Sequence, residues 1–102
     1  SIVSPGSFKS SKDSRFKIAY NQYVIQSDRR DNIKRYLLEN DIPTAIYYPN
    51  TLCQEMKLWS ICDCEKYPNA NHAALTNLAL PLAYLTPSES ELIIELVKDC
   101  YE

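Results

Sequence analysis

Residues 16–48, FKIAYNQYVIQSDRRDNIKRYLLENDIPTAIYY, decide the fold that we predict for this chain. Apolar residues first alternate with polar ones over about ten residues, a spacing typical of a β-strand, with a change of face near Asn21. Apolar residues then recur at helical spacing from Ile33 to Leu37. The short run at 44–48 predicts another strand, which Pro49 ends. The segment therefore predicts a strand, a helix and a strand.

The helix between these two strands has candidate signals at both ends. Ser27 or Asp28 can cap its N-terminus, because both side chains accept hydrogen bonds from the free backbone N–H groups of a first turn. Asn40 and Asp41 follow its last turn. Both residue types tolerate the left-handed backbone that usually ends a helix, so we expect the helix to end there.

The second half of the chain predicts more helix than strand. A short helical segment is expected around residues 52–59, a helix from Pro68 to about Leu78, and an extended link at 79–82. The final helix has the clearest start, a capping box with these residues: Thr86 at the N-cap, Pro87 at N1 and Glu89 at N3. Its predicted buried stripe consists of Leu92, Ile93, Leu96, Val97 and Cys100.

These elements predict an α+β fold, with a small sheet of about three short strands and helices packed on one side. The length of 102 residues fits one domain. Residues 1–15 are rich in Ser, Lys and Asp, which predicts a flexible lead-in or interdomain linker, and residues 16–102 are expected to form the domain. Because the chain begins with Ser1, we expect a processed product or a piece of a longer chain.

Charge and composition argue against several classes of partner. The formal net charge is −2, whereas proteins that bind nucleic acid or anionic membranes usually carry a basic excess. No apolar run reaches the roughly 18 residues of a membrane-spanning helix, and the N-terminus lacks the apolar core of a signal peptide. We therefore expect a cytoplasmic protein that binds neither nucleic acid nor membrane, with its four cysteines reduced.

Residue types that could carry chemistry are present, but in no recognisable arrangement. Cys53, Cys62, Cys64 and His72 could be taken as a zinc-ligand set, yet their spacing is not that of a usual zinc motif. No local motif of a nucleophilic enzyme occurs. Gly6 is the only glycine, which excludes a glycine-rich phosphate loop within these residues. We predict no catalytic, cofactor-binding or metal-binding residue.

Two segments in order carry a family resemblance: residues 20–49, YNQYVIQSDRRDNIKRYLLENDIPTAIYYP, and residues 67–97, YPNANHAALTNLALPLAYLTPSESELIIELV. Their strand, Arg–Asp helix start, "IPTA" turn, "LP" turn and capped last helix resemble the C-terminal small domain of the DegT/DnrJ/StrS sugar aminotransferases. These are pyridoxal-phosphate enzymes of fold type I. The resemblance covers about residues 16–101.

The resemblance implies a function for a longer parent protein. It would transfer an amino group from glutamate to a keto sugar nucleotide, for cell-surface polysaccharide or related amino-sugar biosynthesis, as a homodimer. Pyridoxal 5'-phosphate and its lysine would belong to a large domain that these residues lack, so the fragment itself is expected to be inactive.

The resemblance also implies substrate-binding residues, namely Gln22, Tyr47 and Tyr48. The family pattern has histidines at the positions of Tyr47 and Cys53, so this chain departs from it twice. The alternative hypothesis is a stand-alone, non-catalytic α+β module that uses its tyrosine-rich edge to bind a small molecule or a partner.

Overall fold

The structure is a computed structural model of the chain, and it describes residues 2–4, 15, 19–56, 63–83 and 85–100. Its elements in chain order are β1 (Ile2–Val3), β2 (Tyr23–Ser27), α1 (Arg30–Glu39), α2 (Leu52–Met56), the 3-10 turn η3 (Cys64–Lys66), α3 (Pro68–Thr76), β3 (Asn77–Leu80) and α4 (Pro87–Asp99). The predicted α+β class is confirmed.

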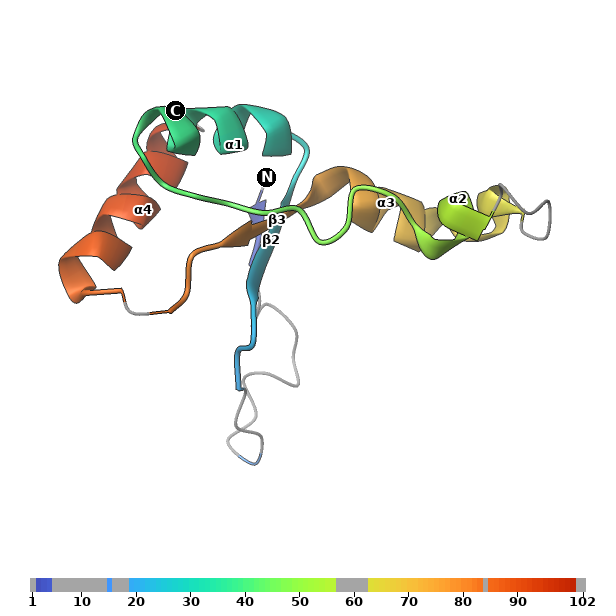
Figure 1. Cartoon of the computed structure of the whole chain (residues 1–102), viewed down its shortest axis with the longest axis horizontal. Helices are drawn as coiled ribbons and strands as arrows, with labels where there is room; N and C mark the ends of the chain where they lie inside the picture. The colour runs from blue at the N-terminus through green and yellow to red at the C-terminus, as the bar shows by residue number, and fades with distance from the viewer. Residues whose placement is uncertain (1, 5–14, 16–18, 57–62, 84, 101–102) are drawn as a thin grey trace.

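The sheet is antiparallel and has the strand order β1-β2-β3. Strand β2 is central: Tyr23 pairs with Leu80 and Gln26 with Asn77 on one side, while Ser27 pairs with Ile2 on the other. Figure 1 shows α1 and α4 together on one side of this sheet, with α2 and α3 projecting away from α4.

The core lies where α1 and α4 meet the sheet. Ile33 and Leu37 of α1 and Leu78 of β3 are fully buried, and Ile25 and Leu96 complete the cluster. Burying a side chain of this kind stabilises the fold by about 1.5–3 kcal/mol. The core therefore joins the two helices α1 and α4 to the paired strands β2 and β3.

Helix α1 confirms its predicted end and corrects its predicted start. Asp41 has a positive φ of 61°, the left-handed conformation expected after the last turn. The N–H groups of Asp41 and Ile42 donate to the carbonyls of Leu38 and Leu37, which is a Schellman motif. The predicted cap was wrong: Arg29 is the N-cap residue without a side-chain cap bond, and Ser27 Oγ instead accepts from the N–H of Arg29.

Helix α4 confirms the predicted capping box. Thr86 Oγ1 accepts from the N–H of Glu89, and a carboxylate oxygen of Glu89 accepts from the N–H of Thr86. Ile93 and Leu96 are buried as predicted, but Leu92 is 46% exposed. The predicted stripe was therefore too wide on that side.

The predicted strands were misplaced. Residues 44–48 form only an isolated bridge, in which Ala45 and Ala79 exchange two backbone hydrogen bonds of 3.1 and 2.7 Å. Helix α3 ends at Thr76, so Asn77 and Leu78, predicted to be helical, open β3. Strand β1 lies within the predicted lead-in, although the boundary between residues 15 and 16 stays a prediction.

Elements α2, η3 and α3 form a projection that we call the arm. The radius of gyration is 15.7 Å, whereas a compact domain of this length has about 13 Å. Arg30 Nη1 donates to the carbonyl of Ala74 at 2.7 Å and ties the base of the arm to α1. In the described part of the chain, no helix has the length and apolar character needed to span a membrane.

Candidate functional site

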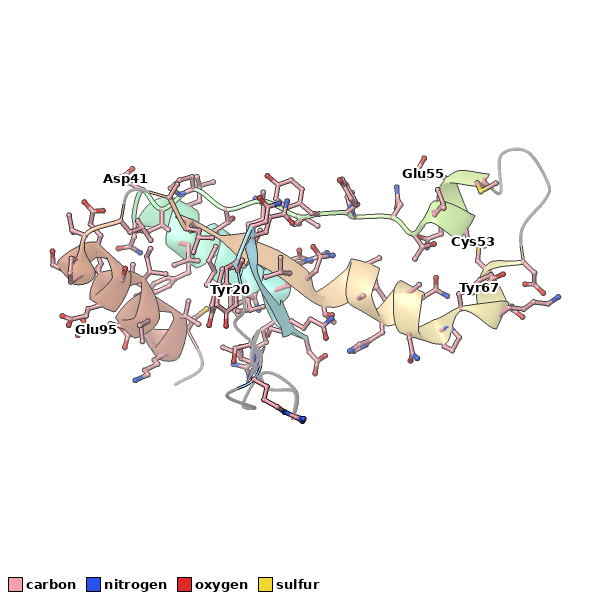
Figure 2. All side chains as sticks on the ribbon, turned by 90° about the horizontal axis from the view of Figure 1, so that it is seen from below. Tyr20, Asp41, Cys53, Glu55, Tyr67 and Glu95 are labelled. Atoms are coloured by element: carbon pink, nitrogen blue, oxygen red, sulfur yellow. The ribbon has the colours of Figure 1, made fainter. Side chains whose placement is uncertain are left out.

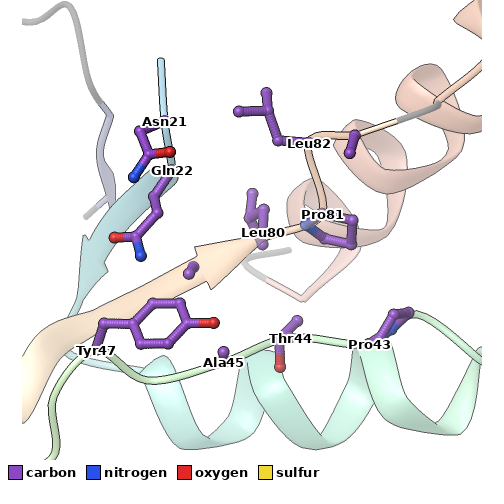
Figure 3. Close-up of a pocket in the computed structure, with 11 residues that line it drawn as sticks. Asn21, Gln22, Pro43, Thr44, Ala45, Tyr47, Leu80, Pro81 and Leu82 are labelled. Carbon is purple, nitrogen blue, oxygen red and sulfur yellow. The ribbon is translucent and has the colours of Figure 1, made fainter.

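A pocket of about 360 Å³ lies where the extended segment 43–47 crosses the end of β3. We call it the Tyr47 pocket, and Figure 3 shows it in close-up. Its lining residues are Asn21, Gln22, Pro43, Thr44, Ala45, Tyr47, Ala79, Leu80, Pro81, Leu82 and Ala83. None of these described lining residues carries a formal charge at neutral pH. The volume is within the range of small-molecule sites.

Two sets of backbone interactions fix Tyr47 at the pocket. The bridge between Ala45 and Ala79 holds the segment against the edge of β3. Asn77, which is only 5% exposed, then accepts the N–H of Tyr47 through Oδ1 at 2.9 Å. Its Nδ2 atom donates to the carbonyls of Ala73 at 2.8 Å and Tyr48 at 3.2 Å. Asn77 therefore joins the tyrosine segment to the end of α3.

The pocket offers polar groups on one side and an aromatic ring on the other. In Figure 3, the amide of Gln22 faces the ring of Tyr47, with Asn21 beside Gln22. Neither amide side chain has a hydrogen-bond partner among the described residues, so both can bind a ligand. The hydroxyl of Thr44 is already engaged, because Lys34 Nζ donates to it at 3.4 Å.

Tyr48 belongs to a different cavity. It is 71% exposed, and together with Gln26, Asn50 and Thr51 it lines a neighbouring pocket of about 410 Å³ at the base of the arm. Tyr47 lines both pockets, and its ring meets the Tyr48 ring edge-on with centroids 5.9 Å apart. The peptide bond between the two tyrosines is cis.

The structure thus brings together two of the three predicted site residues. Gln22 and Tyr47 line one pocket, while Tyr48 faces the next one. The sequence did not indicate Asn21 as a lining residue or Asn77 as the residue that holds the segment. Asn77 gave no signal because an asparagine at the end of a predicted helix is typical of a simple helix terminus.

The cysteines, but not the histidine, differ from the sequence-based expectation. His72 is exposed on α3, and among the described residues no group of three metal-ligating side chains occurs. Cys62 lies outside the described residues. The expectation of fully reduced thiols was wrong in this structure, because Cys53 is disulfide-bonded.

Comparison with known proteins gives one informative similarity. No family model matches the chain. The chain is similar to a protein of Geobacillus stearothermophilus named "Pleiotropic regulatory protein", with 30% identity over 91 residues. The match covers 87% of this chain and 24% of the relative, so the chain spans about a quarter of the relative's length.

This similarity contradicts the aminotransferase prediction. The relative's printed name describes a regulatory protein, not an enzyme that transfers amino groups to sugars. The prediction depended on a series of short segments, none of which is specific alone, and both histidines of the pattern are replaced, by Tyr47 and Cys53. No observation on the described residues bears on pyridoxal phosphate, glutamate or a homodimer, which stay untested predictions.

Proposed function

We propose that this chain is a non-catalytic binding module of a regulatory protein, and that the Tyr47 pocket binds a sugar-containing small molecule such as a sugar nucleotide. The regulatory part of the proposal derives from the name of the similar protein. The binding part derives from the pocket. The expected cytoplasmic location and the absence of nucleic-acid and membrane partners remain predictions within this proposal.

The observation that carries the binding proposal is the unpartnered amide of Gln22 facing the ring of Tyr47 across the pocket. A sugar or a base presents a flat, partly apolar face together with hydroxyl or amide groups at its edge. An aromatic ring can cover the face, while amides both donate to and accept from the edge. This pairing suits an uncharged ring better than a bare anion.

The pocket's chemistry supports binding over catalysis. General acid–base chemistry needs a titratable group within hydrogen-bond reach of the reacting atom. The described lining contains no Asp, Glu, His, Lys or Cys, and its only titratable side chain is the phenol of Tyr47. Its remaining polar side chains are amides and a threonine hydroxyl, which can orient a ligand.

The test is a calorimetric titration of the whole chain with UDP-glucose as the probe. We expect saturable binding with a Kd of about 1 mM or tighter, equivalent to about −4 kcal/mol. Tyr47→Ala removes the aromatic ring that would cover the sugar or base, so it should weaken binding at least about tenfold. A tenfold change in Kd corresponds to about 1.4 kcal/mol of binding free energy.

Tyr67→Ala is the matched control for this titration. Tyr67 is 51% exposed and Tyr47 is 45% exposed, but Tyr67 lies on the arm and does not line the Tyr47 pocket. The control should bind as the parent chain does. Absence of heat with millimolar UDP-glucose, or equal weakening by both substitutions, would refute binding of this ligand class at Tyr47.

A further inference from the structure

The sheet has two faces, and the register of β2 and β3 assigns their side chains to one or the other. Paired residues of an antiparallel sheet point to the same face, and the face alternates along each strand. Ile25 pairs with Leu78, and both are buried in the core beside α1 and α4. The alternate pairs point to the opposite face, which we call the open face. It consists of these pairs: Val24 with Ala79, and Gln26 with Asn77.

The open face joins the Tyr47 pocket to the neighbouring pocket. Ala79 lines the Tyr47 pocket, whereas Gln26 and Asn77 line the neighbouring pocket of about 410 Å³. Tyr47 lines both, so it lies where the two pockets meet. Because the pockets share one sheet face and one side chain, a ligand longer than either pocket can occupy both.

The start of the arm closes one side of the neighbouring pocket. Ala70 and Ala73 of α3 and Leu52 of α2 line it there. Figure 2 shows that the arm continues beyond these residues, with Glu55 and Tyr67 toward its far end. The pocket therefore lies between the open face and apolar side chains of the arm, which suit a flat group with little charge.

The neighbouring pocket also offers an aromatic ring and an amide. Tyr48 is 71% exposed, so its ring is accessible to a ligand. This ring is inclined by 73° to the ring of Tyr47, and one flat group therefore cannot stack on both. The side chain of Gln26 is half-buried and has no hydrogen-bond partner among the described residues. The two rings are thus suited to two different parts of a ligand.

We propose that the two pockets are two subsites of one site for a sugar nucleotide, with the sugar in the Tyr47 pocket and the base against Tyr48. This inference rests on the function proposed above and adds the second subsite and the orientation. A sugar carries several hydroxyl groups, which the amides of Asn21 and Gln22 can bind. A base is flat and has a polar edge, which suits the exposed ring of Tyr48 and the amide of Gln26.

The phosphates of such a ligand join its two parts and cross Tyr47. Among the described residues that line either pocket, none carries a formal charge at neutral pH. The phosphates therefore stay in contact with solvent, and the sugar and the base supply the recognition. The ligand class is defined by these two parts and not by an anion site.

The test is an isotope-filtered NOE spectrum of the whole chain, labelled with ¹³C and ¹⁵N, in the presence of unlabelled UDP-glucose. We expect NOEs from the ring protons of Tyr48 to the ring C–H protons of uracil. We also expect NOEs from the side-chain amide of Gln22 to protons of glucose. This measurement reports on each subsite separately and needs no variant.

Calorimetry of two variants at one position supports the assignment. Tyr48→Ala should weaken UDP-glucose binding at least about fivefold, the loss expected when one base–aromatic stack is removed. Tyr48→Phe keeps the ring and should bind within about twofold of the parent chain. Equal weakening by both variants would contradict stacking of the base on this ring.

The failures of the two proposals are distinguishable. Ligand NOEs to Tyr47 without any to Tyr48 would overturn the second subsite and leave the proposed function intact. Glucose protons at Tyr48 together with uracil protons at Gln22 would overturn the orientation. Ligand NOEs to neither tyrosine would refute the proposed function and this inference together.

Discussion

Asn77 organises the candidate site more than any other single residue. It is buried at the junction of α3 and β3, and its amide holds the Tyr47 N–H on one side and three carbonyls on the other. A buried amide that satisfies this many backbone groups fixes local geometry, because each group left without a partner costs about 1–3 kcal/mol. The position of Tyr47 therefore depends on a residue outside the Tyr47 pocket.

We predict that Asn77→Ala lowers the free energy of unfolding by about 1–3 kcal/mol, because the N–H of Tyr47 loses its acceptor and the carbonyl of Tyr48 loses its donor. Urea unfolding followed by circular dichroism measures this loss. Asn32→Ala is the control, since Asn32 is exposed on α1 and should change stability by no more than about 0.5 kcal/mol. Equal effects of the two substitutions would show that the Asn77 network is not stabilising.

At the scale of elements, α1 contributes two of the five residues of the core cluster, Ile33 and Leu37. Leu37 is fully buried against the sheet, whereas Leu38, the next residue, is 67% exposed. Two neighbouring leucines of the same helix therefore lie in opposite environments, one in the core and one in solvent. This contrast follows from helical periodicity, in which neighbouring residues lie about 100° apart around the axis.

We predict that Leu37→Ala destabilises the fold by about 2–5 kcal/mol, through lost burial and the cavity that remains. Leu38→Ala should change the free energy of unfolding by less than about 0.5 kcal/mol. Chemical denaturation of both variants compares identical substitutions. A similar loss in the two would contradict the placement of α1 on the sheet.

Helices were predictable from the sequence to a degree that strands were not. Asp41 marked the C-terminal end of α1, and the Thr86–Glu89 capping box marked the N-terminal end of α4. Both signals are local, because they depend on hydrogen bonds between residues close together in the sequence. The composition of segment 44–48 predicted a strand, yet the segment pairs with β3 only through a single bridge between Ala45 and Ala79. Pairing between distant segments depends on tertiary contacts, which residue types alone do not specify.

At the scale of the whole molecule, the Tyr47 pocket and the arm are two regions of different chemistry. The Tyr47 pocket lies beside the sheet, and the Cys53–Cys64 contact lies on the arm. The family resemblance implied Gln22, Tyr47 and Tyr48 as substrate-binding residues. Gln22 and Tyr47 line the Tyr47 pocket and Tyr48 lines the neighbouring one, while their role in binding stays a prediction. The sequence did not predict the closeness of Cys53 and Cys64, which lie 11 residues apart in the sequence.

The central claim is that the Tyr47 pocket is a ligand site, and amide chemical-shift mapping with UDP-glucose tests it most directly. We predict that the largest shifts in a ¹H–¹⁵N spectrum of the whole chain occur at Gln22, Ala45, Tyr47 and Ala79. Amides of α4 beyond Ile94 should not shift, and Tyr47→Ala should abolish the shifts at Gln22 and Ala79. Shifts confined to the arm, or none at millimolar ligand, would contradict the claim.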